Sequence, residues 1–343
     1  MAQKKRPDAG LTQLKKELTE GKLGTLYLFH GEEDYLRDYY LETVRKKLLP
    51  PGTETFNLHV FQGKDLDLQT LSDCVDALPM LNDRTVLVVY DYDLFKNEER
   101  RSRLEGLFQD LPDYVCLIFV YDLLPFKANG NTRLGKLIKK VGVTVEFQPQ
   151  QQSDLNAWIR RHFKALGKEI DNSTAEYLTF LCGGLMTGLG GEIEKIGSYA
   201  PGEKITKADI DAVATPVLDA RVFAMSDAIG AGRFDQAMAV LSDLYQMNEA
   251  PIKILAVLGT QLRQMWSARL ALEQKKGQDY LSGLWKLRTS WQARKLLDAA
   301  RRFDLGWCRN AVALAAEADL AMKSSGADGE ELLVDLLLKL ACC

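Results

Sequence analysis

Short apolar runs alternate with helix-forming segments through the first 147 residues, and this alternation limits the folds that the chain can adopt. Each run is short and almost continuously apolar, which is typical of a strand buried on both faces. Helical patterns separate the runs, and strands separated by helices predict a parallel sheet covered on both sides. The expected strands are residues 25–30, 56–61, 85–90, 115–121 and 143–147, and the expected helices are residues 35–49, 67–78, 98–111 and 131–140.

The chain changes character after residue 148, where only helical patterns follow. Residues 149–214 predict a small helical domain, in which the glycine pairs 183–184 and 190–191 bracket a short connection. Residues 215–343 predict a bundle of helices, one of which opens at Pro251 in the position that favours a first-turn proline. The expected organisation is therefore an α/β domain over residues 1–148 followed by two all-α domains.

Composition places the protein among soluble intracellular chains. No apolar run approaches the roughly 20 residues that cross a bilayer, so no membrane partner is expected. No apolar segment follows the basic residues 4–6, so we expect a cytoplasmic protein without a secretory signal. The six cysteines are scattered, which favours free thiols over disulfides or a zinc site. A net charge of −3 excludes a globally basic nucleic-acid binder but leaves room for a local basic face.

The turn after the first expected strand, residues 29–37, lies where a nucleotide-binding α/β domain cradles phosphate. A P-loop needs several glycines, a lysine and a Ser or Thr. This turn has Gly31 alone, followed by the acids of residues 32–34, which would repel phosphate. Asp91 and Asp93 end a strand as a magnesium-holding acid does, but without a P-loop we interpret them as solvated strand-end acids.

Other catalytic patterns are absent from the sequence. His30, His59 and His162 are far apart and have no metal-binding spacing, so we expect them to be structural. No nucleophile motif such as GxSxG appears. The sequence therefore predicts no catalytic residue, no metal ligand and no cofactor.

Residues 78–84 predict an unusually apolar turn between a helix and the third strand. Turns are normally polar because their backbone meets water, yet Leu78, Pro79, Met80 and Leu81 stand side by side here. Either these side chains fill a gap in the protein's own core, or they are presented to a partner.

A basic stretch covers residues 260–302, which hold ten Lys or Arg residues against three acids and include three tryptophans. Basic residues interleaved with aromatics can meet nucleic-acid phosphates. The commoner use of such a pattern is a solvated helix face around core tryptophans. The residues that we single out as possible DNA contacts are Arg263, Arg269, Arg294 and Lys295.

Several segments together resemble the delta subunit family of the bacterial DNA polymerase III clamp loader. Residues 27–36 are similar to its opening strand, turn and helix, and residues 78–84 to its segment of proline, two bulky residues, a polar stretch and arginine. Residues 317–324 resemble its pattern of an acid, Asp-Leu and Lys before a leucine-rich last helix. Positions that fit its collar helices are Phe223, Asp227, Ala228, Gly232, Ala237, Leu241 and residues 251–263.

The resemblance implies a RecA-like AAA+ parallel-sheet module, a small helical lid domain and a C-terminal helical collar domain. It implies a non-catalytic subunit of the DNA-directed DNA polymerase holoenzyme, which hydrolyses no ATP itself. The implied partners are the beta sliding clamp, loader subunits of the gamma/tau and delta-prime type held through the collar, and primed DNA within the assembly.

By position, the family's clamp-contacting pair falls on Met80 and Leu81, where the family often has an aromatic residue. Methionine adapts to irregular pockets, so the pair can still bind. We expect a supporting role for Leu78 and Pro79. The expected polar rim of this contact consists of Asn82, Asp83 and Arg84. Two alternatives stay open: a divergent P-loop ATPase, and a helical protein that binds DNA through residues 260–302.

Overall fold

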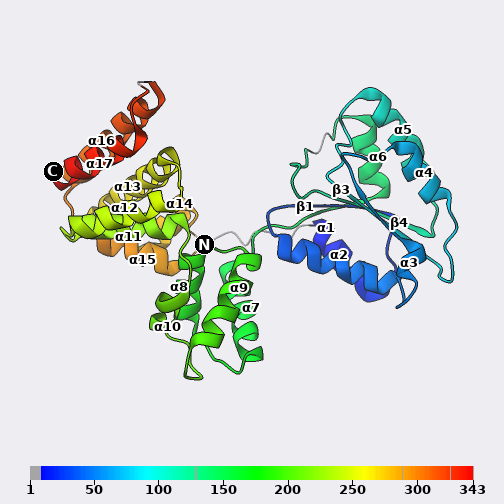
Figure 1. Ribbon diagram of the computed structural model, residues 1–343, viewed down its shortest axis with the longest axis horizontal. Helices are drawn as coiled ribbons and strands as arrows, with labels where there is room; N and C mark the ends of the chain where they lie inside the picture. The colour runs from blue at the N-terminus through cyan, green and yellow to red at the C-terminus, as the bar shows by residue number, and fades with distance from the viewer. Residues whose placement is uncertain (1–8, 128–129, 288, 325, 343) are drawn as a thin grey trace. The chain divides into compact units, whose positions relative to one another are not determined.

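A computed structural model describes residues 9–127, 130–287, 289–324 and 326–342. The chain divides into two compact units (Figure 1). The first comprises Met1–Pro149 with Leu185–Thr187, and the second comprises Gln150–Gly184 with Gly188–Cys343. Among the described residues, no helix is both long enough and apolar enough to cross a membrane.

The first unit is built on a parallel five-stranded sheet with the strand order β2-β3-β4-β1-β5. The central strands β3 and β4 are apolar and buried almost throughout, which fits a sheet covered on both faces. The prediction of a parallel α/β sheet is therefore confirmed. The strands are β1 (Leu26–His30), β2 (Leu58–Gln62), β3 (Thr85–Tyr90), β4 (Val115–Val120) and β5 (Val143–Glu146).

Side chains alternate between the two faces of this sheet and form two separate cores. In β1, Tyr27 and Phe29 pack with α1 and α2 on one face, whereas Leu26 and Leu28 pack with α4, α5 and α6 on the other. Figure 1 shows α1 and α2 on one side of the sheet and α5 and α6 on the opposite side. These helices are α1 (Ala9–Glu20), α2 (Asp34–Leu48), α4 (Leu68–Asp76), α5 (Glu98–Gln109) and α6 (Arg133–Val141).

Two helices of the first unit were not predicted. In α1 only Gly10 and Leu14 are buried, so its apolar pattern is too sparse to stand out. The other is α3 (Glu54–Asn57), a single turn that occupies part of the segment expected to be strand. A four-residue helix shows no periodicity, so the sequence pattern predicts a strand over the whole of residues 56–61.

The second unit is helical, as predicted, and contains one isolated bridge between Glu169 and Lys204. One prediction was wrong here: residues 190–191 are not part of a connection, because α9 runs through both glycines. The first four helices of the second part of the chain are α7 (Gln152–Ala165), α8 (Asn172–Cys182), α9 (Met186–Tyr199) and α10 (Lys207–Val213).

Five of the remaining helices, α11, α12, α13, α16 and α17, share one apolar core. Buried residues of α14 and α15 pack with α13 in another. Pro251 opens α13 as predicted. Trp291 of α15 is buried and lies near Phe180 of α8 and Phe223 of α11. The helices are α11 (Leu218–Gly230), α12 (Phe234–Gln246), α13 (Pro251–Glu273), α14 (Gln278–Trp285), α15 (Ser290–Ala300), α16 (Leu305–Ser324) and α17 (Gly329–Ala341).

Candidate functional site

Residues 78–84 form a loop between α4 and β3, at the end of the sheet where its parallel strands begin. We call this segment the apolar loop. Its three large apolar side chains are exposed: Leu78 by 74%, Met80 by 58% and Leu81 by 84%. These side chains therefore do not fill a gap in the protein's own core. Leu78, which we expected to be a support, is even more exposed than Met80.

The backbone of the apolar loop is held at Met80 by a side chain from α3. Asn57 is fully buried, and its Oδ1 accepts a hydrogen bond from the Met80 N–H at 2.8 Å. Its Nδ2 donates to the Met80 carbonyl at 2.7 Å and to the Thr53 carbonyl at 3.1 Å. One amide thus satisfies both backbone groups of Met80, which fixes the backbone without covering the side chain.

Two further polar side chains fasten the loop, one to the end of α2 and one to the chain around the beginning of β1 and β4. The Nδ2 of Asn82 donates to the carbonyls of Leu48 and Arg84 at 3.0 and 2.7 Å. The Arg84 guanidinium donates to the carbonyls of three residues at the beginning of β1 and β4: Leu23, Gly24 and Val115.

This arrangement differs from the expected polar rim of Asn82, Asp83 and Arg84. Asn82 and Arg84 are half-buried and bonded to the protein's own backbone, and only Asp83 is exposed. The difference arises because a polar residue next to a strand can bond backbone carbonyls as readily as water. We therefore assign Asn82 and Arg84 to the support of the loop.

Leu81 adopts a left-handed backbone conformation, with φ of 55°. A residue with a Cβ pays roughly 1–2 kcal/mol in this region, and glycine is its usual occupant. Such a conformation persists only where the surroundings impose it. The apolar loop therefore holds a bulky, exposed leucine in a conformation that its own backbone disfavours.

The turn after β1 has a different construction from a phosphate-binding loop. Gly31 has φ of 128°, and a Cβ at this position would lie 2.3 Å from the carbonyl oxygen of Phe147. That carbonyl accepts a hydrogen bond from the Glu33 N–H at 3.0 Å. The Glu33 side chain is fully buried, and its carboxylate accepts from the Met186 N–H at 3.1 Å. The glycine thus serves close packing of two backbone segments.

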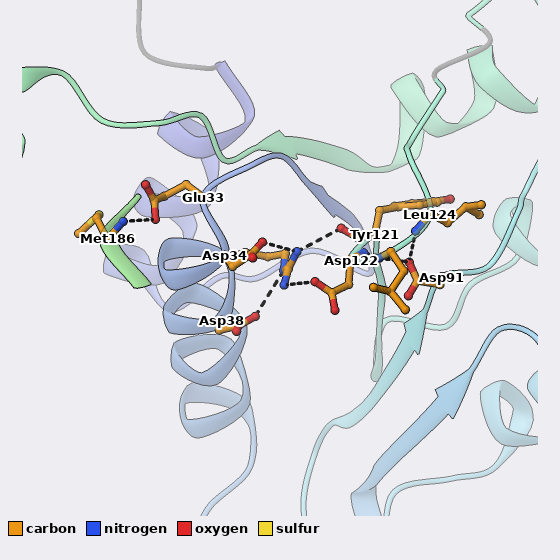
Figure 2. Close-up of polar contacts among 10 residues, drawn as sticks. Glu33, Asp34, Asp38, Asp91, Tyr121, Asp122, Leu124 and Met186 are labelled. Atoms are coloured by element: carbon orange, nitrogen blue, oxygen red, sulfur yellow. Dashed lines mark hydrogen bonds and ion pairs between the residues drawn. The ribbon is translucent and has the colours of Figure 1, made fainter. Parts of the chain in front are cut away.

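Arg37, in the first turns of α2, forms a dense ionic cluster beside this turn (Figure 2). Its side chain is 4% exposed, and its guanidinium lies 2.9 Å from Asp34, 3.3 Å from Asp38 and 2.7 Å from Asp122. It also donates to the Tyr121 carbonyl at 3.2 Å, at the end of β4. Burial acts to lower the pKa of Arg37, but the three carboxylates outweigh burial and the pKa is raised.

The interpretation of Asp91 as a solvated acid was wrong. Its Oδ1 accepts hydrogen bonds from the backbone N–H groups of Asp122, Leu123 and Leu124, each at 2.9 Å. The carboxylate at the end of β3 therefore shapes the loop after β4 (Figure 2). Asp93 is exposed; its carboxylate accepts a local hydrogen bond from the Phe95 N–H, and its carbonyl accepts one from Arg100.

The four basic residues that we singled out lie on α13 and α15 and are not joined to one another by any hydrogen bond or ion pair that the described part of the chain contains. Arg269 is 3.6 Å from Glu273, and Arg263 donates to Thr260. Arg294 is exposed, and the Lys295 ammonium lies 5.5 Å from the centre of the Trp291 ring. Contact with DNA stays a prediction.

Two cysteines and two histidines of the described segments have structural surroundings. Burial raises the pKa of Cys116 and of Cys182 to about 12, so neither thiol is activated at neutral pH. The Nδ1 of His162 lies 3.0 Å from the Trp158 carbonyl, and the His30 ring packs on Phe126. In the described ranges, no group of three or more His, Cys, Asp or Glu residues could hold a metal ion.

Two protein families match the sequence. The family described as "DNA polymerase III, delta subunit" matches residues 27–148, and the family described as "DNA polymerase III delta subunit, C-terminal domain" matches residues 219–340. DNA polymerase III subunit delta of Bacillus subtilis (strain 168) is 25% identical over 332 residues, which cover 95% of each chain. The protein of the same name from Escherichia coli (strain K12) is 23% identical over 314 residues, 91% of this chain and 89% of the other.

A solved structure shares the fold of this chain. The Bacillus subtilis DNA clamp loader delta protein aligns with a TM-score of 0.51 and 24% identity, and the alignment covers 97% of this chain and 100% of that one. This likeness confirms the predicted fold class, a parallel-sheet α/β module followed by a helical C-terminal part.

Proposed function

Because the chain belongs to the DNA polymerase III delta subunit family, we propose that it acts within a clamp loader by binding the beta sliding clamp through the apolar loop. In this proposal Met80 and Leu81 are the principal anchors, Leu78 adds apolar contact, and Pro79 shapes the approach to them. The exposed Asp83 belongs to the polar rim of the contact.

The observation that carries the proposal is the combination of exposed apolar side chains with a fixed backbone. An apolar cluster on the surface of a soluble protein marks an interaction site when it is contiguous. Binding energy concentrates in a few apolar anchors that enter a pocket on the partner. Leu78, Met80 and Leu81 lie within four consecutive residues and are more than half exposed, so they can act as such anchors.

The proposed mechanism needs binding energy and no chemical step. A protein that binds the open form of a ring better than the closed form shifts the population toward opening by that difference in affinity. Anchors on a short, fixed loop can deliver this difference, because they fit only one arrangement of the partner's pocket. The chain would thus promote clamp opening, or hold the clamp open, for loading onto primed DNA.

We further propose that the chain hydrolyses no ATP. The turn after β1 offers one glycine, which packs against Phe147, and no lysine. Arg37 is held by three carboxylates, so its charge is already neutralised and does not attract phosphate. The seven helices α11–α17 would join the gamma/tau-type and delta-prime-type subunits that carry out hydrolysis, and basic residues of α13 and α15 would approach DNA within the assembly.

The test is the double variant Met80→Ala with Leu81→Ala, measured by surface plasmon resonance against the sliding clamp of the same organism. We expect clamp affinity to fall by about 2–4 kcal/mol, the range of interface hot spots. The free energy of unfolding should change by no more than ~0.5 kcal/mol per site, because both side chains are exposed.

Leu123→Ala is the matched control. Leu123 is 87% exposed but follows β4, at the end of the sheet opposite to the apolar loop. Its affinity for the clamp should equal that of the unaltered chain. Unchanged clamp binding by the double variant would refute the assignment of the apolar loop, and an equal loss in the Leu123 variant would show that any exposed apolar residue suffices.

A further inference from the structure

A single polar side chain, Asn57, links α3 to the apolar loop across 23 positions of sequence. It bonds the N–H and the carbonyl of Met80 as the backbone of a neighbouring strand would. An amide side chain offers an acceptor oxygen and a donor nitrogen side by side in one neutral planar group. Aspartate would keep the acceptor and lose the donor, and an apolar residue would lose both. An amide is therefore favoured at position 57 because it pairs with both backbone groups of Met80 in the loop.

The hydrogen bonds of Asn57 are strong constraints because the amide is fully buried. A buried donor or acceptor without a partner carries a free-energy penalty, so the amide and the Met80 backbone stay together. Their geometry fixes the residue directly before Leu81. Leu81 itself adopts a left-handed conformation, with φ of 55°, which an unrestrained chain would leave.

Residues that are hydrogen-bonded to the rest of the protein alternate with freely exposed residues along the loop. The backbone is bonded at Met80, the side chain of Asn82 is bonded to the carbonyl of Leu48 at the end of α2, and that of Arg84 to the carbonyl of Gly24 before β1. Leu81 and Asp83, which lie between these hydrogen-bonded residues, are exposed. The loop is thus fastened on both sides of Leu81, and Asn57 supplies the fastening on the side of α3.

We propose that Asn57 is a positioning residue, which holds the apolar loop of the free protein in the conformation that binds the clamp. The inference rests on the proposed function, because it needs the apolar loop to be the clamp contact. Its physical basis is pre-organisation: a loop that is already ordered loses less conformational entropy on binding. If only a fraction of free molecules has the competent loop, the measured affinity falls to that fraction of its intrinsic value.

The first measurement concerns the free protein and needs no clamp. In Asn57→Ala the Met80 N–H loses its acceptor, so hydrogen exchange in a peptide that covers residues 78–84 should become at least about tenfold faster. Exchange in β1 and β4 should stay unchanged. Asn57→Asp keeps the acceptor for the Met80 N–H and should show a smaller increase.

The second measurement is clamp affinity of the full chain at a temperature where every variant is folded. Asn57→Ala should bind the clamp about tenfold more weakly, a loss of the size that loop ordering causes. Ile138→Val is the matched control, because Ile138 is buried in α6 of the same unit and does not touch the loop. It should lower the melting temperature and leave clamp affinity unchanged.

A third arm tests whether Asn57 acts through Leu81. In a Leu81→Ala background, the additional loss caused by Asn57→Ala should shrink below about threefold, because residues that act together are not additive. The same tenfold loss in both backgrounds would overturn the inference.

The outcomes separate the inference from the proposed function. If Met80→Ala with Leu81→Ala abolishes clamp binding while Asn57→Ala binds normally, the clamp contact stands and the positioning role is refuted. If the double variant binds normally, the proposed function itself fails. A loss in Asn57→Ala that Ile138→Val reproduces would reduce Asn57 to a contributor to stability.

Discussion

Leu81 combines a high exposed fraction with a strained backbone, and stability alone does not select this combination. The side chain is 84% exposed, so it gains little from burial, and φ is 55°. A residue that costs stability where it stands is expected at sites of function. The conflict within one residue is therefore an independent indication that the apolar loop serves binding.

The variant Leu81→Gly separates the effect of the exposed side chain from the effect of the left-handed backbone. Glycine removes a left-handed penalty of roughly 1–2 kcal/mol and adds an entropic cost of roughly 0.5–1 kcal/mol, so the free energy of unfolding should rise by about 0.5–1 kcal/mol. Clamp affinity should fall in the same variant, because the anchor is lost. Chemical denaturation and clamp binding measured on the same preparation check both expectations.

Leu78→Gly is the control for this variant, since Leu78 is also exposed but is not among the residues with positive φ. It should gain no stability. If Leu81→Gly unfolds more easily than the unaltered chain, the leucine side chain stabilises the loop and the argument from strain is wrong.

Single residues also mark the limit of what the sequence predicts. Met80 and Leu81 stood out because apolar residues in a turn are unusual. Asn57 gave no signal, because its role depends on a partner 23 positions away. Asn82 and Arg84 looked like surface polar residues, and their inward hydrogen bonds follow from the packing of strands that sequence patterns do not place.

At the scale of elements, strands were predicted well and short or polar helices poorly. The run at Thr85–Tyr90 matches β3 to the residue, because every position is apolar or β-branched. The helix α3 escaped because one turn has no period, although it carries the side chain that holds the apolar loop. Likewise, α9 continues through a glycine pair because tertiary packing overrides local propensity.

Arg37 joins the helix α2 to the end of β4, and its replacement tests this junction. In Arg37→Met the Tyr121 carbonyl loses a buried donor at 3.2 Å. The acids around Arg37 are about half exposed, so water can solvate them, and the expected loss in the free energy of unfolding is only about 1–3 kcal/mol. Urea denaturation measures it.

Lys46→Met on the same helix is the control, because Lys46 is 77% exposed and pairs only with Glu42 at 3.5 Å. An exposed pair contributes roughly 0–1 kcal/mol. Equal losses in the two variants would show that Arg37 contributes no more than a surface charge. A loss confined to Arg37 supports its role as the tie between α2 and the sheet.

Across the first unit, the parallel sheet separates the apolar loop from the Gly31 turn and the Arg37 cluster. The apolar loop precedes β3, whereas the turn of Gly31 and the cluster of Arg37 follow β1 and lie beside the end of β4. A strand of six residues, such as β3, spans roughly 20 Å. The turn after β1 can therefore be filled with internal contacts without altering the apolar loop at the opposite end of the sheet.

A fragment of residues 1–149 contains both cores of the sheet and the hydrogen bonds that fasten the apolar loop. We expect the fragment to fold and to bind the clamp within about threefold of the full chain, because binding resides in a few anchors. It should be less stable than the full chain, since Glu33 loses its hydrogen bond from Met186. Circular dichroism reports folding, and surface plasmon resonance reports affinity. The same fragment with Met80→Ala and Leu81→Ala should lose about 2–4 kcal/mol of affinity, as the full chain does. A folded, unaltered fragment that binds no clamp would place essential contacts in the second unit.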